Sequence, residues 1–200
     1  MTSEASSPAP RLTGGCQCGA VRYAVTAEPE KPSICHCRMC QKAFGAYFAP
    51  LASVKKAAFE WTRGQPTRFR SSSLVSRGFC ALCGTPLTYE FHGVPAPGSD
   101  AADAARHGEP PEAVASSPGF AAHDEVAFSL GSLDDPALVP PVIQYGIEAR
   151  MPWLASLDRL PGSVTEDDMP EGAMDALVSY QHPDHDTADW PPASDAKAKT

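Results

Sequence analysis

The sequence predicts a mostly β, sandwich-like fold of short antiparallel strands. Apolar residues alternate with other residues over many short segments, and glycine or proline separates these segments from one another. In the first segment, GAVRYAVTA, Val21, Tyr23 and Val25 alternate as in a half-buried strand. The other candidate strands, in chain order, are 46–54, 57–61, 66–71, 74–80, 85–91, 125–133 and 141–149.

Composition divides the chain into one domain and its flanking segments. Residues 1–11 are rich in serine, alanine and proline and are predicted to be disordered, whereas residues 12–165 form the predicted domain. Residues 92–122 contain too little apolar surface to offset the entropy of ordering them, so a long mobile surface insertion is expected. Residues 166–200 are predicted to be an acidic, proline-rich tail with one possible helix at 171–181.

Four residues of this tail are of types that bind metals: His182, Asp184, His185 and Asp186. Nothing in the sequence pre-organises them, because they lie close to the end of the chain. A solvated terminal segment is therefore expected rather than a metal site.

Composition also excludes several classes of partner. The 200-residue chain is 42% hydrophobic and carries a formal net charge of −8, without the basic excess of a general nucleic-acid binder. No apolar run approaches the roughly 20 residues that a membrane span needs. The N-terminus lacks the basic-then-apolar pattern of a secretory signal. A cytoplasmic protein is therefore predicted, with no nucleic-acid or membrane partner.

Seven cysteines lie in three tight groups with C-x-C, C-x-C-x-x-C and C-x-x-C spacing. Disulfides are rare in a reducing cytoplasm. These spacings are typical of metal ligands, so metal binding is preferred over free or redox-active thiols.

The first and last groups are pairs that can together supply four thiolates to one ion. Cys16 and Cys18 precede a predicted strand, and Cys80 and Cys83 lie in a knuckle-like turn that ends at Gly84. Four thiolates satisfy a closed tetrahedral zinc site, which is structural in nature. Such an ion would tie the N-terminal strand to a central hairpin and stabilise the fold.

That pairing leaves three cysteines on one short loop: Cys35, Cys37 and Cys40. An ion with three protein ligands keeps an open position, as catalytic zinc sites do. His36 lies within the run but is expected to point away from its ligating neighbours. His92 and His123 flank the insertion and are weaker candidates for the fourth ligand. One binuclear cluster shared by all three groups is an alternative that spacing alone leaves open.

An open three-thiolate zinc site favours thiol chemistry over water activation. Three thiolates donate much negative charge, which weakens the ion as a Lewis acid but suits it to a fourth soft ligand. Coordination deprotonates a substrate thiol at neutral pH. The resulting thiolate can attack a small electrophile such as an aldehyde.

At this point the sequence resembles a known family. The segments that carry the resemblance are GGCQCGAVRY, CHCRMCQKAFGA, RGFCALCGTPLTYE, FSLGSLDDP and RMPW. They are similar to the glutathione-dependent formaldehyde-activating enzymes, whose domain centromere protein V shares. The resemblance spans about Leu12 to Leu160 and implies an Mss4-like β fold.

The resemblance also implies ligand roles and a reaction. It implies a structural zinc ion at Cys16, Cys18, Cys80 and Cys83 and a catalytic zinc ion at Cys35, Cys37 and Cys40, two ions per chain. The implied reaction condenses formaldehyde with glutathione to S-(hydroxymethyl)glutathione and is formally that of a carbon–sulfur lyase in reverse. The long insertion and the extended tail depart from the family pattern.

Six further residues near the cysteines are candidates for substrate contact. A thiol such as glutathione carries carboxylates, for which Arg38, Lys42 and Arg77 are the candidate partners. Solvated side chains or ion pairs are equally expected for them. Three aromatic residues are candidates for a pocket wall, although core packing is preferred for each of them: Phe44, Phe48 and Trp153.

The sequence therefore predicts a zinc-dependent enzyme that adds a thiol to a small aldehyde. Two alternatives share its metal sites. One is a non-catalytic interaction module that uses zinc for folding alone, and the other is a carrier of thiol–aldehyde adducts.

Overall fold

The structure of the protein is a computed structural model, which describes residues 12–93 and 124–191. The predicted disordered segment 1–11 lies outside the described residues. So do nearly all of the predicted insertion 92–122 and the end of the tail from residue 192 onward.

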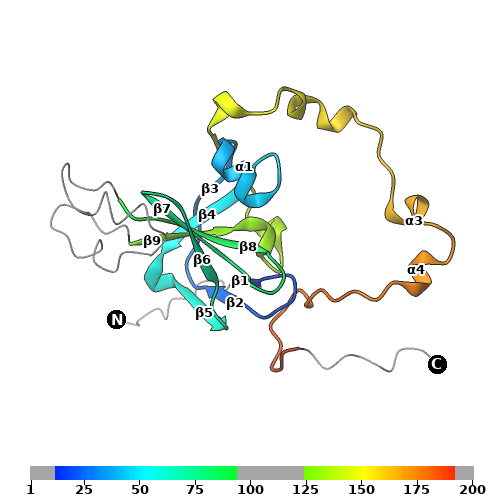
Figure 1. Ribbon diagram of the computed structural model, residues 1–200, viewed down its shortest axis with the longest axis horizontal. Coiled ribbons are helices and arrows are strands. Elements are labelled where there is room, and N and C mark those ends of the chain that lie inside the picture. Colours follow the sequence, from blue (N-terminus) through cyan, green and yellow to red (C-terminus); the bar gives the residue numbers. More distant parts are fainter. Residues whose placement is uncertain (1–11, 94–123, 192–200) are drawn as a thin grey trace, which may run out of the picture.

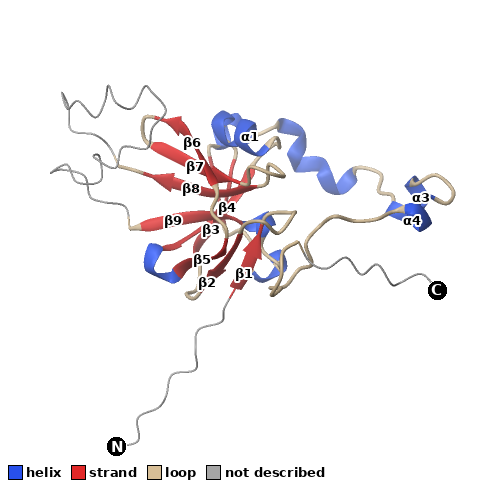
Figure 2. Cartoon of the chain, turned by 60° about the horizontal axis from the view of Figure 1, so that its bottom comes forward, coloured by secondary structure: helices blue, strands red, loops and turns tan. Residues whose placement is uncertain are grey.

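The described chain forms two β-sheets (Figures 1 and 2). The smaller sheet has the order β1-β2-β5, with bounds β1 Leu12–Gly15, β2 Arg22–Val25 and β5 Phe59–Arg63. The larger sheet has the order β10-β3-β4-β9-β8-β7-β6. Its strands are β3 Glu30–Cys35, β4 Ala49–Lys55, β6 Thr67–Ser72, β7 Val75–Phe79, β8 Pro86–Phe91, β9 Glu125–Ser129 and β10 Ile143–Tyr145. The predicted mostly β, sandwich-like fold is confirmed.

Helices are short in the described part of the chain. The α-helices are α1 Arg38–Phe44, α3 Thr165–Asp168 and α4 Ala173–Ala176. Short 3₁₀ helices cover Lys56–Ala58, Leu130–Ser132, Pro136–Leu138, Ile147–Ala149 and Pro152–Arg159. None of the helices described is both long and apolar enough to cross a bilayer.

The core contains side chains from both sheets. The strand predicted around Tyr23 is present as β2, but the expectation that it is half-buried is wrong, because Arg22 and Ala24 are buried as well as Tyr23 and Val25. Tyr23 is fully buried, stacks on Phe59 with ring centroids 5.0 Å apart and lies 5.8 Å from the ring of Phe128. Its hydroxyl and that of Ser132 are 2.9 Å apart, which satisfies a polar atom deep in the core. This core fixes the two loops that carry the cysteine pairs.

Two predictions about elements are wrong. The cysteine triplet does not lie on a short loop, because Cys35 ends β3 and Cys40 lies inside α1. The strands are not all antiparallel, since β10 runs parallel to β3 after a long connection from β9. The possible helix at 171–181 is present as the short α4, which has no buried residue and therefore no packing to extend it.

The C-terminal part of the chain leaves the sheets and then returns to them. In both views α3 and α4 stand apart from the sheets, and the chain then runs back toward β1 and β2 (Figures 1 and 2). The return is anchored at His182, which is 3% exposed, and at Asp186, which pairs with buried Arg22 at 2.8 Å. The expectation of a solvated segment is therefore wrong for His182, which the sheet of β1, β2 and β5 binds, whereas Asp184 and His185 are exposed.

Candidate metal centres

The two cysteine pairs meet at one point of the fold. The sulfur atoms of Cys16, Cys18, Cys80 and Cys83 lie within 4.8 Å of one another. The Sγ atoms of Cys16 and Cys18 are 3.5 Å apart, and those of Cys18 and Cys80 are 3.8 Å apart. Tetrahedral zinc with Zn–S bonds of about 2.3 Å separates its sulfurs by about 3.8 Å, so these four thiols fit such an ion.

Each pair lies in a tight turn between two strands. The first turn joins β1 to β2, where Gly19 N–H donates to Cys16 O at 2.9 Å. The second joins β7 to β8, where Gly84 N–H donates to Cys80 O at 2.9 Å. Both glycines adopt φ of +78°, which other residues rarely reach. The turns therefore present the sulfurs of each pair to the same point.

The three remaining cysteines form a separate group, so the sulfurs fall into two sites rather than one shared cluster. Their Sγ atoms also lie within 4.8 Å of one another: Cys35, Cys37 and Cys40. Cys37 is the N-cap residue of α1, and its Sγ accepts a hydrogen bond from Cys40 N–H at 3.4 Å. All seven cysteines are free of disulfide bonds, and each of the two groups can hold a metal ion.

Polar contacts hold the three-cysteine group against the turn that follows β10. The Gln41 side-chain amide, buried in α1, donates to His36 O at 2.8 Å and to Ala149 O at 3.0 Å. His36 Nε2 donates to Gln144 Oε1 at 2.9 Å. His36 is therefore directed to β10 and is not a member of the group, as expected from its place between two ligands.

A close backbone contact at Gly146 completes this arrangement. A Cβ atom on Gly146 would lie 2.7 Å from the backbone nitrogen of Cys37, and the residue has φ of +64°. The sequence did not single out Gln41, Gln144 or Gly146. The only sequence signal was that Gly146 interrupts the candidate strand 141–149, where a glycine can mark a close backbone approach.

The three-cysteine group opens into a pocket of about 300 Å³. Arg77, Tyr89 and Tyr145 line it together with the cysteines. The buried guanidinium of Arg77 donates to Cys40 Sγ at 3.3 Å and to Ser71 Oγ at 3.0 Å, and it lies 5.1 Å from the Tyr89 ring centroid. A fourth ligand can therefore reach this group from the pocket, whereas the four-cysteine group is already complete.

Burial and charge give the three thiols different acidities. Burial raises the pKa of Cys35 to about 12. Burial also acts on Cys37, but the hydrogen bond from Cys40 N–H and the nearby Arg77 outweigh it and lower the pKa. For Cys40 burial dominates over the hydrogen bond from Arg77, and the pKa is raised. The protein holds protons on part of this group unless a cation displaces them.

The structure separates the three predicted substrate-contact cations. Arg77 lines the cysteine pocket, whereas Lys42 lines a neighbouring pocket, where it is exposed. Arg38 lines neither pocket and donates to Gln41 Oε1 at 3.0 Å. Arg38 thus supports the glutamine that holds the cysteine loop.

The other predicted candidates lie in different places. His92 contacts Ser76 Oγ at 2.7 Å and belongs to neither cysteine group, while His123 lies outside the described residues. Phe48 contacts the His36 ring edge-to-face at 5.9 Å. Trp153 is 40% exposed and packs on Tyr47, so the expectation of core packing is wrong for it.

The returning C-terminal segment binds to the four-cysteine site, which the sequence did not indicate. His182 N–H donates to Gln17 O at 2.7 Å, and Trp190 Nε1 donates to Cys18 O at 2.5 Å. Arg63 donates to His182 Nε2 at 3.3 Å and also to Thr187 O. His182 thus positions the cysteine loop and is not itself part of the ligand group.

Comparison with known proteins bears on the part of the chain that holds these sites. Residues 11–102, which include all seven cysteines, match the family model described as glutathione-dependent formaldehyde-activating enzyme. The predicted family resemblance is confirmed over this segment. The family's description names glutathione and formaldehyde as the small molecules concerned.

The other two comparisons found either no match or only a distant one. No curated protein matches the chain. One solved structure that matches is a crystal structure of a Rhodobacter sphaeroides protein, 17% identical, with a TM-score of 0.41. The match covers 66% of this chain and 98% of that one. A likeness at this score supports no statement about function.

Proposed function

We propose that this protein is a zinc-dependent enzyme that adds a small-molecule thiol to a small aldehyde, formally a carbon–sulfur lyase acting in reverse. The observation that carries the proposal is the contrast between the two cysteine groups. Both groups border a pocket, but four sulfurs can saturate one ion, whereas the three sulfurs that line the pocket of about 300 Å³ leave a position for a further ligand. A site that stays open toward a pocket suits a reacting ligand rather than a purely structural ion. Glutathione and formaldehyde, the family's named substrates, are the first pair to test.

In this proposal the seven cysteines are ligands of two zinc ions per chain. Cys16, Cys18, Cys80 and Cys83 hold the structural ion, and the triplet of Cys35, Cys37 and Cys40 holds the catalytic one. A zinc ion bound by the triplet would supply a soft Lewis acid that favours the thiolate form of a substrate thiol. Free thiol ligands persist in a reducing compartment, so we place the protein in the cytoplasm.

Arg77 acts at the sulfur atoms in this mechanism. Its guanidinium touches Cys40 Sγ and is buried, so it offsets part of the negative charge that three thiolates and a substrate thiolate bring together. It also borders the pocket from which the substrate enters. Lys42, at the exposed rim of the neighbouring pocket, is the proposed partner of a substrate carboxylate.

Tyr89 supplies the proton that the addition needs. It lines the pocket with the cysteines, and burial raises the pKa of its hydroxyl, which therefore stays protonated at neutral pH. As the carbon–sulfur bond forms, the aldehyde C=O bond becomes single and the oxygen takes the Tyr89 proton. The thiol proton leaves to solvent, and a solvent proton restores Tyr89, so the product is the sum of thiol and aldehyde.

Metal content and turnover in matched cysteine variants test the proposal. The purified protein should hold close to two zinc ions per chain. Cys37→Ser should lose about one ion and the NMR-detected formation of the glutathione–formaldehyde adduct, while the chain keeps its fold. Cys83→Ser should lose the structural ion and unfold.

Other outcomes would point to the alternatives. Adduct formation by the intact protein at the uncatalysed rate, with glutathione and with other small thiols alike, would leave only a carrier or an interaction module. If both variants merely unfold, the division into a structural and a catalytic site is wrong.

A further inference from the structure

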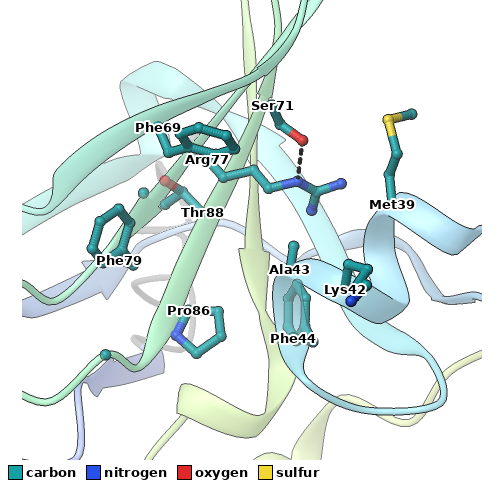
Figure 3. A pocket seen from close by; sticks show the side chains of 12 residues that line it. Met39, Lys42, Ala43, Phe44, Phe69, Ser71, Arg77, Phe79, Pro86 and Thr88 are labelled. Atoms are coloured by element: carbon teal, nitrogen blue, oxygen red, sulfur yellow. Dashed lines mark hydrogen bonds between the residues drawn. The ribbon is translucent and has the colours of Figure 1, made fainter. Parts of the chain in front are cut away.

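A second and larger pocket lies beside the three-cysteine site. Its volume is about 520 Å³, and it lies between α1 and the strands β6, β7 and β8 (Figure 3). Its walls are mainly apolar and aromatic: Met39, Phe44, Phe69, Phe79 and Pro86. Size and lining are those of a small-molecule site.

The two pockets share one boundary. Met39, Ser71 and Arg77 line both the apolar pocket and the pocket that holds the cysteines. Figure 3 shows the Arg77 side chain crossing toward Met39 and Ala43, with its Nε bound to Ser71. The two pockets therefore adjoin along Met39, Ser71 and Arg77, and a molecule that occupied both would contact these three side chains.

The charges around this pocket suit a particular kind of molecule. Of its lining residues only Lys42 and Arg77 are charged. Two nitrogens of Arg77 are bound to Cys40 Sγ and Ser71, which leaves its buried Nη1 and the Lys42 ammonium as the cationic groups that a ligand here can reach. Glutathione carries two carboxylates and an ammonium group, whose desolvation against aromatic walls is costly without partners. An apolar group gains free energy in the same place.

We propose that this pocket receives the apolar body of the thiol substrate, a group of the size of a phenyl or branched alkyl chain, while its sulfur lies at the three cysteines. The proposal rests on the proposed function, because it needs a thiol at that site, and it narrows the substrate class to thiols with an apolar body. Lys42 at the rim leaves room for one carboxylate on such a thiol.

Cobalt-substituted protein gives a direct measure of thiol binding, because a thiol that joins the three cysteines changes the visible absorption of the ion. Three thiols are titrated: 2-phenylethanethiol, 2-mercaptoethanol and glutathione. Burial of a phenyl group should give 2-phenylethanethiol an affinity about ten-fold to a hundred-fold higher than that of the other two.

A pair of tryptophan variants locates the effect. Ala43 lines the pocket on the exposed side of α1, whereas Ala46 is exposed just beyond that helix and does not line the pocket. Ala43→Trp should fill the pocket and abolish the preference for 2-phenylethanethiol, without changing the 2-mercaptoethanol affinity. Ala46→Trp should keep the preference.

The outcomes separate this inference from the proposed function. If all three thiols change the spectrum with equal affinity, or if Ala43→Trp leaves the preference intact, the apolar pocket is not the substrate site. If no thiol changes the spectrum of the cobalt-loaded protein, thiol binding itself fails and the proposed function falls with it.

Discussion

At the scale of single residues, Arg77 links the two pockets to the three-cysteine group. Buried arginines are rare unless they have partners, and this one has the Cys40 sulfur, the Ser71 hydroxyl and the Tyr89 ring. Because Arg77 lies beside a cluster of potential thiolates, its positive charge can stabilise their negative charge, which a distant surface arginine cannot do. Its contribution is therefore expected to appear in thiol binding more than in folding.

Replacing Arg77 by methionine should weaken thiol binding to the cobalt-loaded protein by about ten-fold to a hundred-fold, because a hydrogen bond to a charged group is lost. Arg159→Met, at an exposed position outside both pockets, is the matched control and should bind thiols normally. Unchanged binding in Arg77→Met would mean that Arg77 serves packing alone.

At the scale of elements, the cysteine triplet depends on three pieces of structure meeting. Cys35 ends β3, Cys37 caps α1, and the turn after β10 is packed against both. Gln41 bridges α1 to that turn through two carbonyl oxygens. The close approach at Gly146 sets the distance between turn and cap.

Gly146→Ala should therefore destabilise the protein by about 2 kcal/mol or more, because it adds an unfavourable left-handed conformation and a clash with Cys37. Gly162→Ala is the control, since a Cβ atom added there would have no other atom within 4 Å and its φ is not positive. Urea unfolding of both variants measures the difference. Equal urea midpoints for the two variants would show that the close contact between Gly146 and Cys37 does not limit the side chain at position 146.

At the scale of the whole molecule, the returning segment 182–190 packs against the four-cysteine site. His182 packs so closely on the cysteine turn that a Cβ on Gly19 would lie 2.1 Å from its ring. Arg22 joins the segment to the core, because it binds both Asp186 and Asp134, the latter at 2.6 Å. The smaller sheet, the turn that carries Cys16 and Cys18, and the segment 182–190 thus pack together as one unit.

Removing the His182 ring should release this segment. In His182→Ala, hydrogen exchange of residues 182–190 should become fast, because the buried side chain that anchors them is lost. His185→Ala, three residues away and exposed, should leave exchange as in the parent protein. Equal exchange in both variants would show that the ion pair of Arg22 with Asp186 holds the segment by itself.

Acid should loosen the same segment. Burial lowers the pKa of His182 below its ordinary 6.5, and Arg22 and Arg63 add to this effect. The unfolded state therefore binds the proton more readily, so the stabilisation is complete above pH 6.5 and is lost as the pH falls. Asp134 acts in the same direction at lower pH, because its hydrogen bonds with Arg22 outweigh burial and lower its pKa from 3.8.

The difference in urea midpoint between the parent protein and His182→Gln measures the His182 effect. This difference should shrink between about pH 7.5 and about pH 5.5. A difference that stays constant over this range would mean that His182 does not titrate with folding.

Elements with a local sequence pattern could be predicted, whereas elements held by distant parts of the chain could not. Alternating apolar residues such as Val21, Tyr23 and Val25 predict a strand from the local sequence alone, because successive side chains of a strand point to opposite faces of the sheet. β3 and α1 carry no such pattern. The six-residue β3 is held by backbone pairing with β4 and β10, and the seven-residue α1 by its Cys37 cap and by Gln41. These contacts come from distant parts of the chain, so the local sequence does not reveal them.

The sequence by itself determined the chemistry available to this protein: seven thiols, spaced as metal ligands, and a mostly β framework to hold them. Only the tertiary structure decided that the pairs close one site while the triplet faces a pocket. It alone also placed Arg77 against Cys40 and brought His182 back from the tail to the first cysteine turn. The physical reason is that spacing limits which neighbours can share an ion, whereas long-range packing decides which side of that ion stays open.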